Sequence, residues 1–306
     1  MNSGWRVLDC IALKGSLRYK RGQLVIHKYD ERTDIVFPLA QIAVVLIGIQ
    51  TSVSGAVITK LSEYDIALLV CDWRSVPTAG AIPWRDHTRI GVRHRSQAEL
   101  SIPRKKQAWS KIVSSKISGQ HSCLLQTTGK TSPHLLRLSQ KVRSGDPENF
   151  EAQAARLYWP LVSGNHSFSR LPGAGISGWN SALDYGYTLL RGYGIRAISG
   201  AGLAGALGVF HHGRGNAFAL VDDLMEPFRP MVDQLVFTRV DHGEELNASV
   251  KQYLSKGLSA AFDNSGKTLP TVFNEFAQQY GLYVEGDIRE LSVPRWKGLL
   301  DAGEGK

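Results

Sequence analysis

The chain has 306 residues, of which 43% are hydrophobic and 21% are charged, so it can bury the core of one large domain or of two ordinary ones. Its three cysteines, Cys10, Cys71 and Cys123, are odd in number and far apart, which excludes metal-type cysteine spacing and argues against a disulfide framework. The net charge of +9 favours an acidic partner, either nucleic acid or an anionic membrane.

The first part of the chain is expected to form short strands. Its start, MNSGWRVLDC, has no apolar run of the kind that signal peptides carry. The longest apolar run of the chain, AVVLIGI, is far too short to cross a bilayer. Alternation, β-branched residues and short apolar runs predict strands at 5–13, 22–29, 34–40, 43–49 and 65–71, with a helix at 54–64. We therefore predict a β-rich domain over residues 1–84 in a cytoplasmic protein with no membrane partner.

The composition then changes, and helical periods dominate. Residues 77–96 combine prolines and glycines with several arginines, which predicts a basic linker at 85–96. Apolar residues at helical spacing predict helices at 96–120, 149–162, 180–198, 223–236, 244–258 and 268–284. The expected fold class is α+β, with the β-rich domain followed by a larger all-helical domain over 97–306.

One glycine-rich stretch has the spelling of a dinucleotide-binding loop. It reads Gly200-x-Gly202-x-x-Gly205, and Asp222 stands where a ribose-binding acid would be expected. Such a loop must follow a strand and open a helix, but the residues before Gly200 continue a helical pattern from Asn180. We therefore interpret the glycines as sites of close helix packing, and the stretch as the approach to His211 and His212.

Three places carry groups that could do chemistry, and each has a simple structural alternative. In GDPENFEAQAARLYW, a helix starting near Asp146 places Glu151 at the edge of its inward face, where the acid could also just favour the helix dipole. Adjacent histidines cannot face one way, so only one of His211 and His212 can enter a given site. Asp223 and Glu226 share one helical face, which is also the pattern of an N-terminal cap.

Taken together, these groups suggest a metal site that acts on nucleic acid. Two glutamates, a histidine and a nearby aspartate form a mixed nitrogen and oxygen set, which suits Mg²⁺ or Mn²⁺. Such ions polarise phosphates and activate hydroxyl groups. The charge balance adds candidates for contact with DNA, although a run of charge is also typical of any solvated face: Arg85, Arg89, Arg93, Arg104, Lys105 and Lys106.

The same motifs resemble a known family. The stretches GDPENFEAQAARLYW, LDYGYTLLRGYGIRAISGAGLAGALGVFHH and FALVDDLMEPFRPMVDQLV are similar to the CRISPR-associated spacer-acquisition integrases, the Cas-one family, as is LLVCDWRSVPTAGAIPW at the end of the β-rich part. DLMEPFRP resembles the branch that accompanies single-protein (type II) RNA-guided effectors. The sequence departs from many relatives at EAQAA, where they have Glu-Gly, and in its short loop HHGRGNAF.

The resemblance implies a fold, partners and a reaction. It implies an N-terminal β-sandwich that dimerises, a helical catalytic domain, and a heterohexamer with a small ferredoxin-like Cas-two subunit in the prokaryotic cytoplasm; an RNA-guided effector is a further candidate partner. The 3′-hydroxyl of a short duplex, the prespacer, would attack a phosphodiester at the CRISPR repeat. Carried over by motif, Glu151, His211 and Glu226 would be catalytic and hold the metal, with Asp223 and His212 as further candidates. His211 is chosen because the family's ligand stands three residues after a glycine and fifteen before the acid.

Two other functions fit the residues. A stand-alone metal-dependent nuclease acting on branched DNA would cleave without a partner subunit. A scaffold without catalytic activity would bind DNA equally with and without metal. Neither alternative is excluded by the motifs alone.

Overall fold

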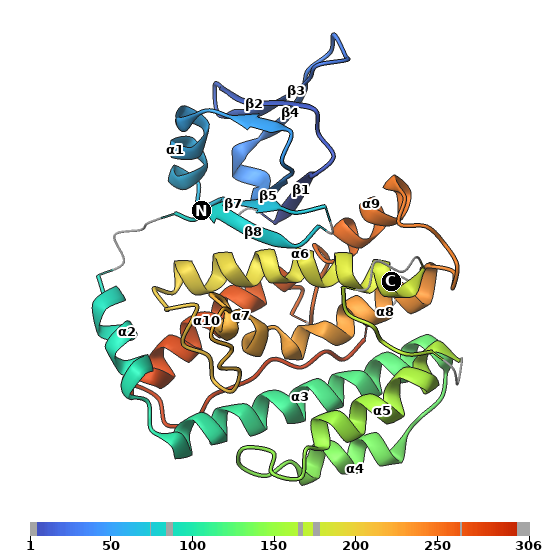
Figure 1. Cartoon of the computed structure of the whole chain (residues 1–306). Helices are drawn as coiled ribbons and strands as arrows, with labels where there is room; N and C mark the ends of the chain where they lie inside the picture. The colour runs from blue at the N-terminus through green and yellow to red at the C-terminus, as the bar shows by residue number, and fades with distance from the viewer. Residues whose placement is uncertain are drawn as a thin grey trace.

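The computed structural model describes residues 5–73, 75–83, 88–164, 168–173, 178–263 and 265–298. The strands lie together at one end of the molecule and the helices form the larger body beneath them (Figure 1). The β-rich part comes first in the chain and the helical part follows, so the α+β class is confirmed.

The strands of the described residues form two four-stranded sheets. The first has the order β1-β5-β7-β8 and consists of Arg6–Cys10, Ile42–Ile47, Ala67–Cys71 and Pro77–Ala81. The second has the order β4-β3-β2-β6 and consists of Ile35–Pro38, Gln23–Lys28, Gly15–Lys20 and Thr51–Val53. β1, β5 and β7 run parallel, and β8 is antiparallel to β7. The five expected strands are present, and β2, β6 and β8 are additions.

β5 explains why one stretch of the sequence is apolar throughout. All of its residues, Ile42–Ile47, are buried. Val45 belongs to the core between the two sheets and helix α1, Gly55–Glu63, whereas Val44 belongs to the core shared with the helices. Because both faces of this sheet are covered, the strand has no polar side to alternate with.

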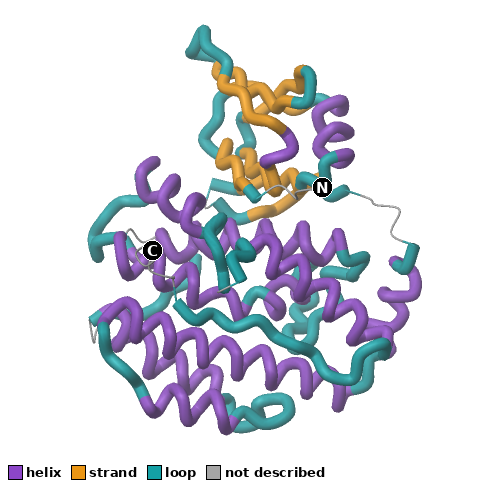
Figure 2. The backbone as a smooth tube through the Cα atoms, turned by 180° about the vertical axis from the view of Figure 1, so that it is seen from behind, coloured by secondary structure: helices purple, strands orange, loops and turns teal. Residues whose placement is uncertain are grey.

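Helices make up most of the remaining chain (Figures 1 and 2). They are α2 Ile90–Glu99, α3 Ile102–Thr128, α4 Pro133–Lys141, α5 Phe150–Ser163, α6 Trp179–Gly200, α7 Ala219–Leu224, α8 Arg229–Arg239, α9 Ala248–Gly257 and α10 Leu269–Glu285. Two short 3-10 turns, η1 Leu39–Gln41 and η2 Glu226–Phe228, complete the elements of the described residues. Over these residues, no helix combines the length and the apolar character needed to cross a membrane.

Three expectations about segment boundaries need correction. Much of the predicted linker is helical, because α2 buries Arg93 and Gln97 against the helical body. The predicted helix 96–120 is broken near Ser101, where Pro103 supports a new helix start. The predicted helix 223–236 is interrupted by η2, since Pro227 and Pro230 lack the N–H groups that a continuous helix needs.

α6 lies between the sheets and the rest of the helices. Its Gly192 faces β5: a Cβ there would lie 3.2 Å from Cγ1 of Val44. On the opposite side, a Cβ at Gly186 would lie 2.5 Å from Cγ1 of Val232 in α8. The helix continues to Gly200, so the glycine triplet that starts there follows a helix and not the strand that a dinucleotide loop requires.

Candidate metal and DNA site

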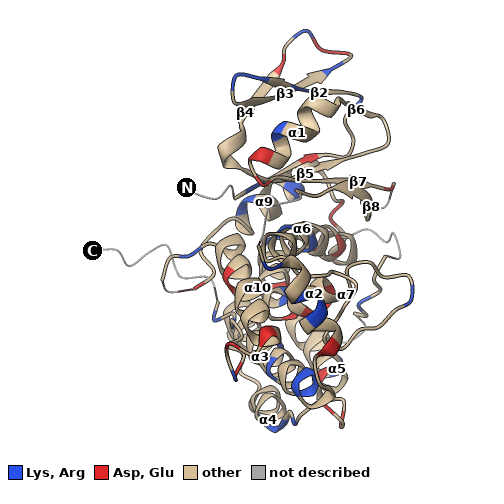
Figure 3. Cartoon of the chain, turned by 90° about the vertical axis from the view of Figure 1, so that its left-hand side faces the viewer, with Lys and Arg blue, Asp and Glu red and all other residues tan. Residues whose placement is uncertain are grey.

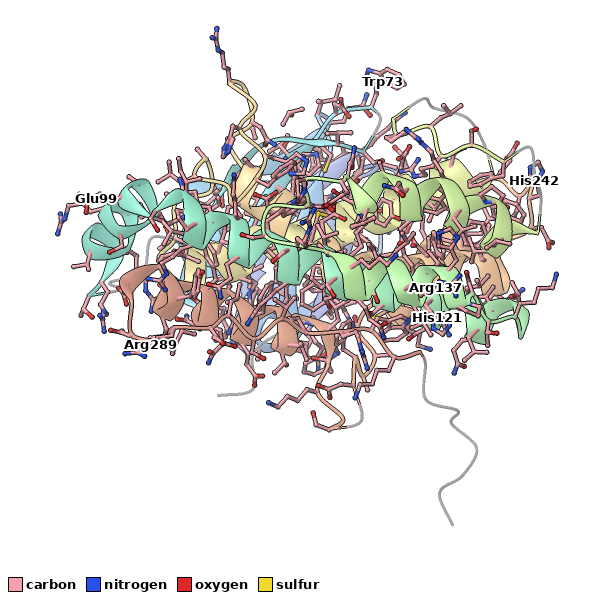
Figure 4. The ribbon with its side chains drawn as sticks, turned by 90° about the horizontal axis from the view of Figure 1, so that it is seen from below. Trp73, Glu99, His121, Arg137, His242 and Arg289 are labelled. Atoms are coloured by element: carbon pink, nitrogen blue, oxygen red, sulfur yellow. The ribbon has the colours of Figure 1, made fainter. Side chains whose placement is uncertain are left out.

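The three residues that the motifs single out meet in the helical body. Glu151 lies in the first turn of α5, Glu226 opens η2, and His211 lies in the loop between α6 and α7. α3 packs against both α5 and η2. In the view from below, α3 runs between the labelled Glu99 at one edge and the labelled His121 and Arg137 toward the opposite edge (Figure 4). Negative charge on Glu226 and Glu151 helps to raise the pKa of His211, so the three groups are close enough to interact electrostatically.

The start of α5 sets the position of Glu151. The helix begins at Phe150, with Asn149 as its N-cap, and not near Asp146 as expected. Asp146 instead caps the helix from outside, because its carboxylate accepts hydrogen bonds from the backbone N–H groups of Phe150 and Glu151 at 2.9 and 3.0 Å. The backbone of Glu151 is therefore fixed by Asp146, and its half-buried side chain projects toward α3.

Lys116 of α3 stands between the two glutamates. Its Nζ lies 2.6 Å from Oε1 of Glu151 and 2.5 Å from Oε2 of Glu226. Its side chain is only 11% exposed. Burial alone would lower the pKa of this lysine, but Glu226 and Glu151 raise it above its ordinary value. The ammonium is therefore charged and neutralises part of the negative charge of the site.

Glu226 is buried and has two cationic neighbours. Besides Lys116, Nη1 of Arg229 donates to its Oε1 at 2.7 Å. Burial opposes ionisation, yet Arg229 and Lys116 together hold the pKa of Glu226 below its ordinary value. The second oxygen of the carboxylate, Oε2, is the one that lies 2.5 Å from Nζ of Lys116. Glu226 is thus an ionised acid, as a metal ligand must be, with a cation on each of its oxygens.

Asp223 does not cap a helix, as the alternative interpretation proposed; it holds the histidine loop. It lies inside α7 and is fully buried. Its carboxylate accepts hydrogen bonds from the backbone N–H groups of Val209 at 2.6 Å and Phe210 at 2.9 Å. It also lies 2.5 Å from Nδ1 of His211. One carboxylate therefore fixes both the backbone of the loop and the ring of His211.

His211 is oriented on several sides. Asp223 engages Nδ1, which leaves Nε2 as the nitrogen available to a ligand. The hydrogen bond to Asp223 raises the pKa of His211. The rings of Trp109 and Phe210 are stacked with centroids 4.5 Å apart, and each meets the imidazole edge-on. A carboxylate on the far nitrogen is the usual arrangement behind a metal-bound histidine.

His212 has a different environment, although it is the next residue. Both histidines are exposed, but the carboxylate of Asp223 engages the ring of His211. The loop reaches this register because a Cβ at Gly208 would lie only 2.4 Å from the carbonyl oxygen of His211 and 2.9 Å from Oδ2 of Asp223. The close approach of Asp223 to the loop therefore requires glycine at position 208.

The donor set fits a divalent cation in its chemistry, with one condition. Glu151, Glu226 and Nε2 of His211 supply two carboxylates and an imidazole, a set that Mg²⁺ or Mn²⁺ accepts. As they stand, however, no three His, Cys, Asp or Glu side chains in the described part of the chain are arranged to hold one ion. Because the ammonium of Lys116 lies against both glutamates, their oxygens would be open to an ion only after Lys116 had moved.

A buried polar chain continues behind Glu226. The guanidinium of Arg229 lies 4.4 Å from the ring centre of Tyr187. Tyr187 donates a hydrogen bond to Asp233, which also accepts one from Tyr158 at 3.1 Å. Tyr158, Tyr187 and Asp233 are buried, whereas the side chain of Arg229 is 30% exposed. Burial raises the pKa of Asp233 to about 6, against the lowering effect of its hydrogen bonds and of Arg229.

Asp233 is expected to give the protein a measurable dependence of stability on pH. Its pKa rises from 3.8 to about 6 on folding, so the folded state binds more protons than the unfolded state between these values, and stability falls as pH rises. The loss should be on the order of 2–3 kcal/mol between pH 4 and pH 7. Asp233→Asn removes it, so urea unfolding should show the variant gaining on the wild type over this range. Parallel stability curves for the two proteins would contradict the assignment.

The candidates for DNA contact fare unequally. Arg85 lies outside the described residues. Arg93 is only 4% exposed and pairs with Glu285, so the expectation that it contacts DNA is wrong for this conformation. Arg89 also pairs with Glu285, at 3.0 Å, and Arg104 stacks 4.2 Å from the ring centre of Tyr283.

Lys105 and Lys106 remain at least partly exposed and stay candidates. Figure 3 shows Lys and Arg spread over the helical body with Asp and Glu among them, and not gathered in one block. Arg89, Arg93 and Arg104, which lie in the basic stretch of the sequence, therefore form contacts between helices.

The roles of Lys116 and Arg229 were not expected from the sequence. A signal was present, because Lys116 follows Trp109, Ile112 and Val113 at seven, four and three residues, and so lies on the apolar stripe of its helix. A lysine on a buried stripe needs a buried acid as its partner.

Comparison with known proteins identifies the family and the fold. The family model described as CRISPR associated protein Cas1 matches residues 10–258. The CRISPR-associated endonuclease Cas1 of Neisseria meningitidis serogroup C (strain 8013) is 36% identical over 259 residues, which cover 83% of each protein. A casposase bound to integration product has a TM-score of 0.76 at 19% identity and covers 94% of this chain and 93% of that chain.

A chain of a Cas6-RT-Cas1–Cas2 complex has a TM-score of 0.75 at 19% identity, with 98% of this chain and 37% of that chain covered. At these identities the two solved structures establish only that the fold is shared. The family match extends over most of the sequence and includes His211, Asp223 and Glu226. The chain therefore belongs to the Cas1 family of CRISPR-associated proteins.

Proposed function

We propose that the protein is a metal-dependent integrase and endonuclease that inserts short double-stranded prespacer DNA into a CRISPR array. The observation that carries the proposal is the position of Glu151 and Glu226 against the same lysine, Lys116. His211 is close enough for both carboxylates to raise its pKa, and Asp223 engages the far nitrogen of the histidine. The family match supports it, as do the names of the relative, an endonuclease, and of the casposase bound to integration product.

The residues divide the work of the reaction. Glu151, Glu226 and Nε2 of His211 would hold Mg²⁺ or Mn²⁺, which when bound polarises the phosphodiester and favours ionisation of the attacking hydroxyl. Asp223 holds His211 in the tautomer that leaves Nε2 free. Arg229 keeps Glu226 ionised. The 3′-oxygen of the prespacer forms a bond to phosphorus, and the bond to the 3′-oxygen of the array strand breaks and leaves a new 3′-hydroxyl.

The proposed assembly has two kinds of partner. One is double-stranded DNA, both prespacer and CRISPR repeat, held mainly through phosphates, with Lys105 and Lys106 among the candidate contacts. The other is a small Cas2-type subunit, supported by the shared fold with a chain of the Cas6-RT-Cas1–Cas2 complex. We further propose that the assembly works in the prokaryotic cytoplasm and that an RNA-guided effector of the single-protein type is a further partner.

A homodimer through the β-rich part, residues 1–84, also belongs to the proposal. β8 and β4 are edge strands, and edges of this kind pair readily with another chain. Ile35 and Val36 of β4 are exposed, at 41% and 49%. Light scattering is expected to give the mass of a dimer at micromolar concentration, and a monomer mass would contradict this part of the proposal.

The activity is tested with the purified chain, its small partner subunit, a short duplex and a plasmid that carries the repeat. Joined product is expected only with Mg²⁺ or Mn²⁺ and only when the duplex has free 3′-hydroxyl ends, so dideoxy-ended duplex is the control. Duplex binding should weaken steeply with salt, because phosphate contacts dominate it. Cleavage of branched DNA without partner, and no joining, would favour the stand-alone nuclease; equal DNA binding with no chemistry would favour the scaffold.

A further inference from the structure

Lys116 is the side chain of the site that a metal-binding role leaves unexplained. A buried lysine is expensive unless it is paired, and this one is paired with both glutamates proposed as ligands. With Arg229 beside Glu226, the local cluster holds two negative and two positive charges. The carboxylates are therefore neutralised without any metal.

We propose that Lys116 is a tethered counter-ion that holds Glu151 and Glu226 together in the metal-free protein and competes with the divalent cation for them. The inference rests on the proposed function, since it concerns the same metal site. The ammonium lies within 2.6 Å of one carboxylate and 2.5 Å of the other, so it already engages the oxygens that would hold the ion. The lysine and the ion would therefore compete for these oxygens.

Charge balance points the same way. The charges of Glu151, Glu226, Lys116 and Arg229 balance one another. A doubly charged ion added to these four groups leaves an excess of positive charge next to Arg229, which is held in place by Glu226 and by the ring of Tyr187. Lys116 is the group free to leave, because its ammonium sits at the end of a flexible four-carbon stem. The metal must therefore displace Lys116, and the apparent Kd for the metal is the intrinsic Kd divided by the fraction of molecules in which the lysine is away from the carboxylates.

The chain offers a matched control on the same helix. Lys111 also pairs with a glutamate, since its Nζ lies 3.0 Å from Oε2 of Glu290. That pair lies at the surface, with Glu290 77% exposed, and it has no second carboxylate. Loss of Lys111 removes the same charge from α3 without touching the site.

The experiment measures Mn²⁺ binding to the full chain by calorimetry, with wild type, Lys116→Met, Lys111→Met and Glu151→Gln. Methionine keeps most of the apolar stem and removes the charge. Lys116→Met is expected to bind Mn²⁺ with a Kd at least about tenfold lower than that of the wild type. Lys111→Met is expected to bind as wild type does, and Glu151→Gln to lose the site. Without metal, Lys116→Met should unfold at a lower temperature than Lys111→Met.

A second measurement uses only the wild type, in case Lys116→Met does not fold. Acylation of lysine amines, followed by peptide mass spectrometry, should modify Lys116 slowly without metal and faster with saturating Mn²⁺, while Lys111 reacts equally in both. If Mn²⁺ binding depends on Glu151 but is equal in wild type and Lys116→Met, or if acylation of Lys116 does not respond to metal, the inference is overturned and the metal site stands. If no binding depends on Glu151 in either protein, the metal site itself is misplaced, and the inference falls with it.

Discussion

Glu151→Ala is expected to reduce the rate of strand transfer by more than about 100-fold. Removal of a residue that only hydrogen-bonds to a metal ligand typically costs about 10–100-fold, and loss of a ligand itself should cost more. The physical reason is that Glu151 supplies one of two carboxylates to the site, and neither Glu226 nor His211 can replace it from its own position. The fold should survive, because the side chain is 23% exposed and its loss leaves Lys116 paired with Glu226. The measurement is the rate at which a short duplex joins a repeat-containing plasmid.

The control for this variant removes a similar pair elsewhere. Glu290→Ala also deletes an acid that pairs with a lysine of α3, but at the surface, so it should join DNA at the wild-type rate. Duplex binding by Glu151→Ala should stay near wild type, since the proposed ligands do not carry the phosphate contacts. Joining by Glu151→Ala at near the wild-type rate would show that the site is misplaced.

His211→Ala should also lose strand transfer by more than about 100-fold, whereas His212→Ala should lose only a modest factor. The two residues are neighbours in sequence and differ in what holds them. His211 has Asp223 on Nδ1 at 2.5 Å and the rings of Trp109 and Phe210 in perpendicular contact, so its Nε2 is fixed in direction. Both histidines are exposed, but Asp223 engages the ring of His211, and a ligand that is not held in direction contributes little to a metal site.

The two histidine variants serve as controls for each other, because each removes one imidazole from the same loop. Asp223→Asn gives an independent check: it weakens the hold on His211 without removing a ligand, so a loss of about 10–100-fold is expected. If His212→Ala loses activity and His211→Ala does not, then His212 is the ligand, and the orientation of His211 by Asp223 serves only the loop.

The larger part of the fold could be predicted because hydrophobic period is a local property. The runs that became β5 and β7, and the spacings that became α5, α6 and α10, are visible in the chain itself. Two of the elements that were not predicted are stabilised by contacts with other segments. The strand β2 reads as a mixed polar segment, and it forms because β3 and β6 pair with it on either side. α2 lies in a stretch rich in arginine and is stabilised by Arg93, which is bonded to Glu285 and to Gln278 of α10.

The candidate site shows the same division. The identities of Glu151, His211 and Glu226 could be proposed from the sequence, since helical spacing and motif resemblance both act along the chain. The sequence did not say that Asp223 orients His211, that Arg229 keeps Glu226 ionised, or that Lys116 stands between the glutamates, because these contacts join α3, α5, η2 and a loop that are distant in sequence. Residue type and hydrophobic period determined which groups could act. The packing of α3 against α5 and η2 decided which of them come into contact. The physical reason is that a buried charge needs a partner, and the partner is in reach only when the elements that carry the two charges pack together.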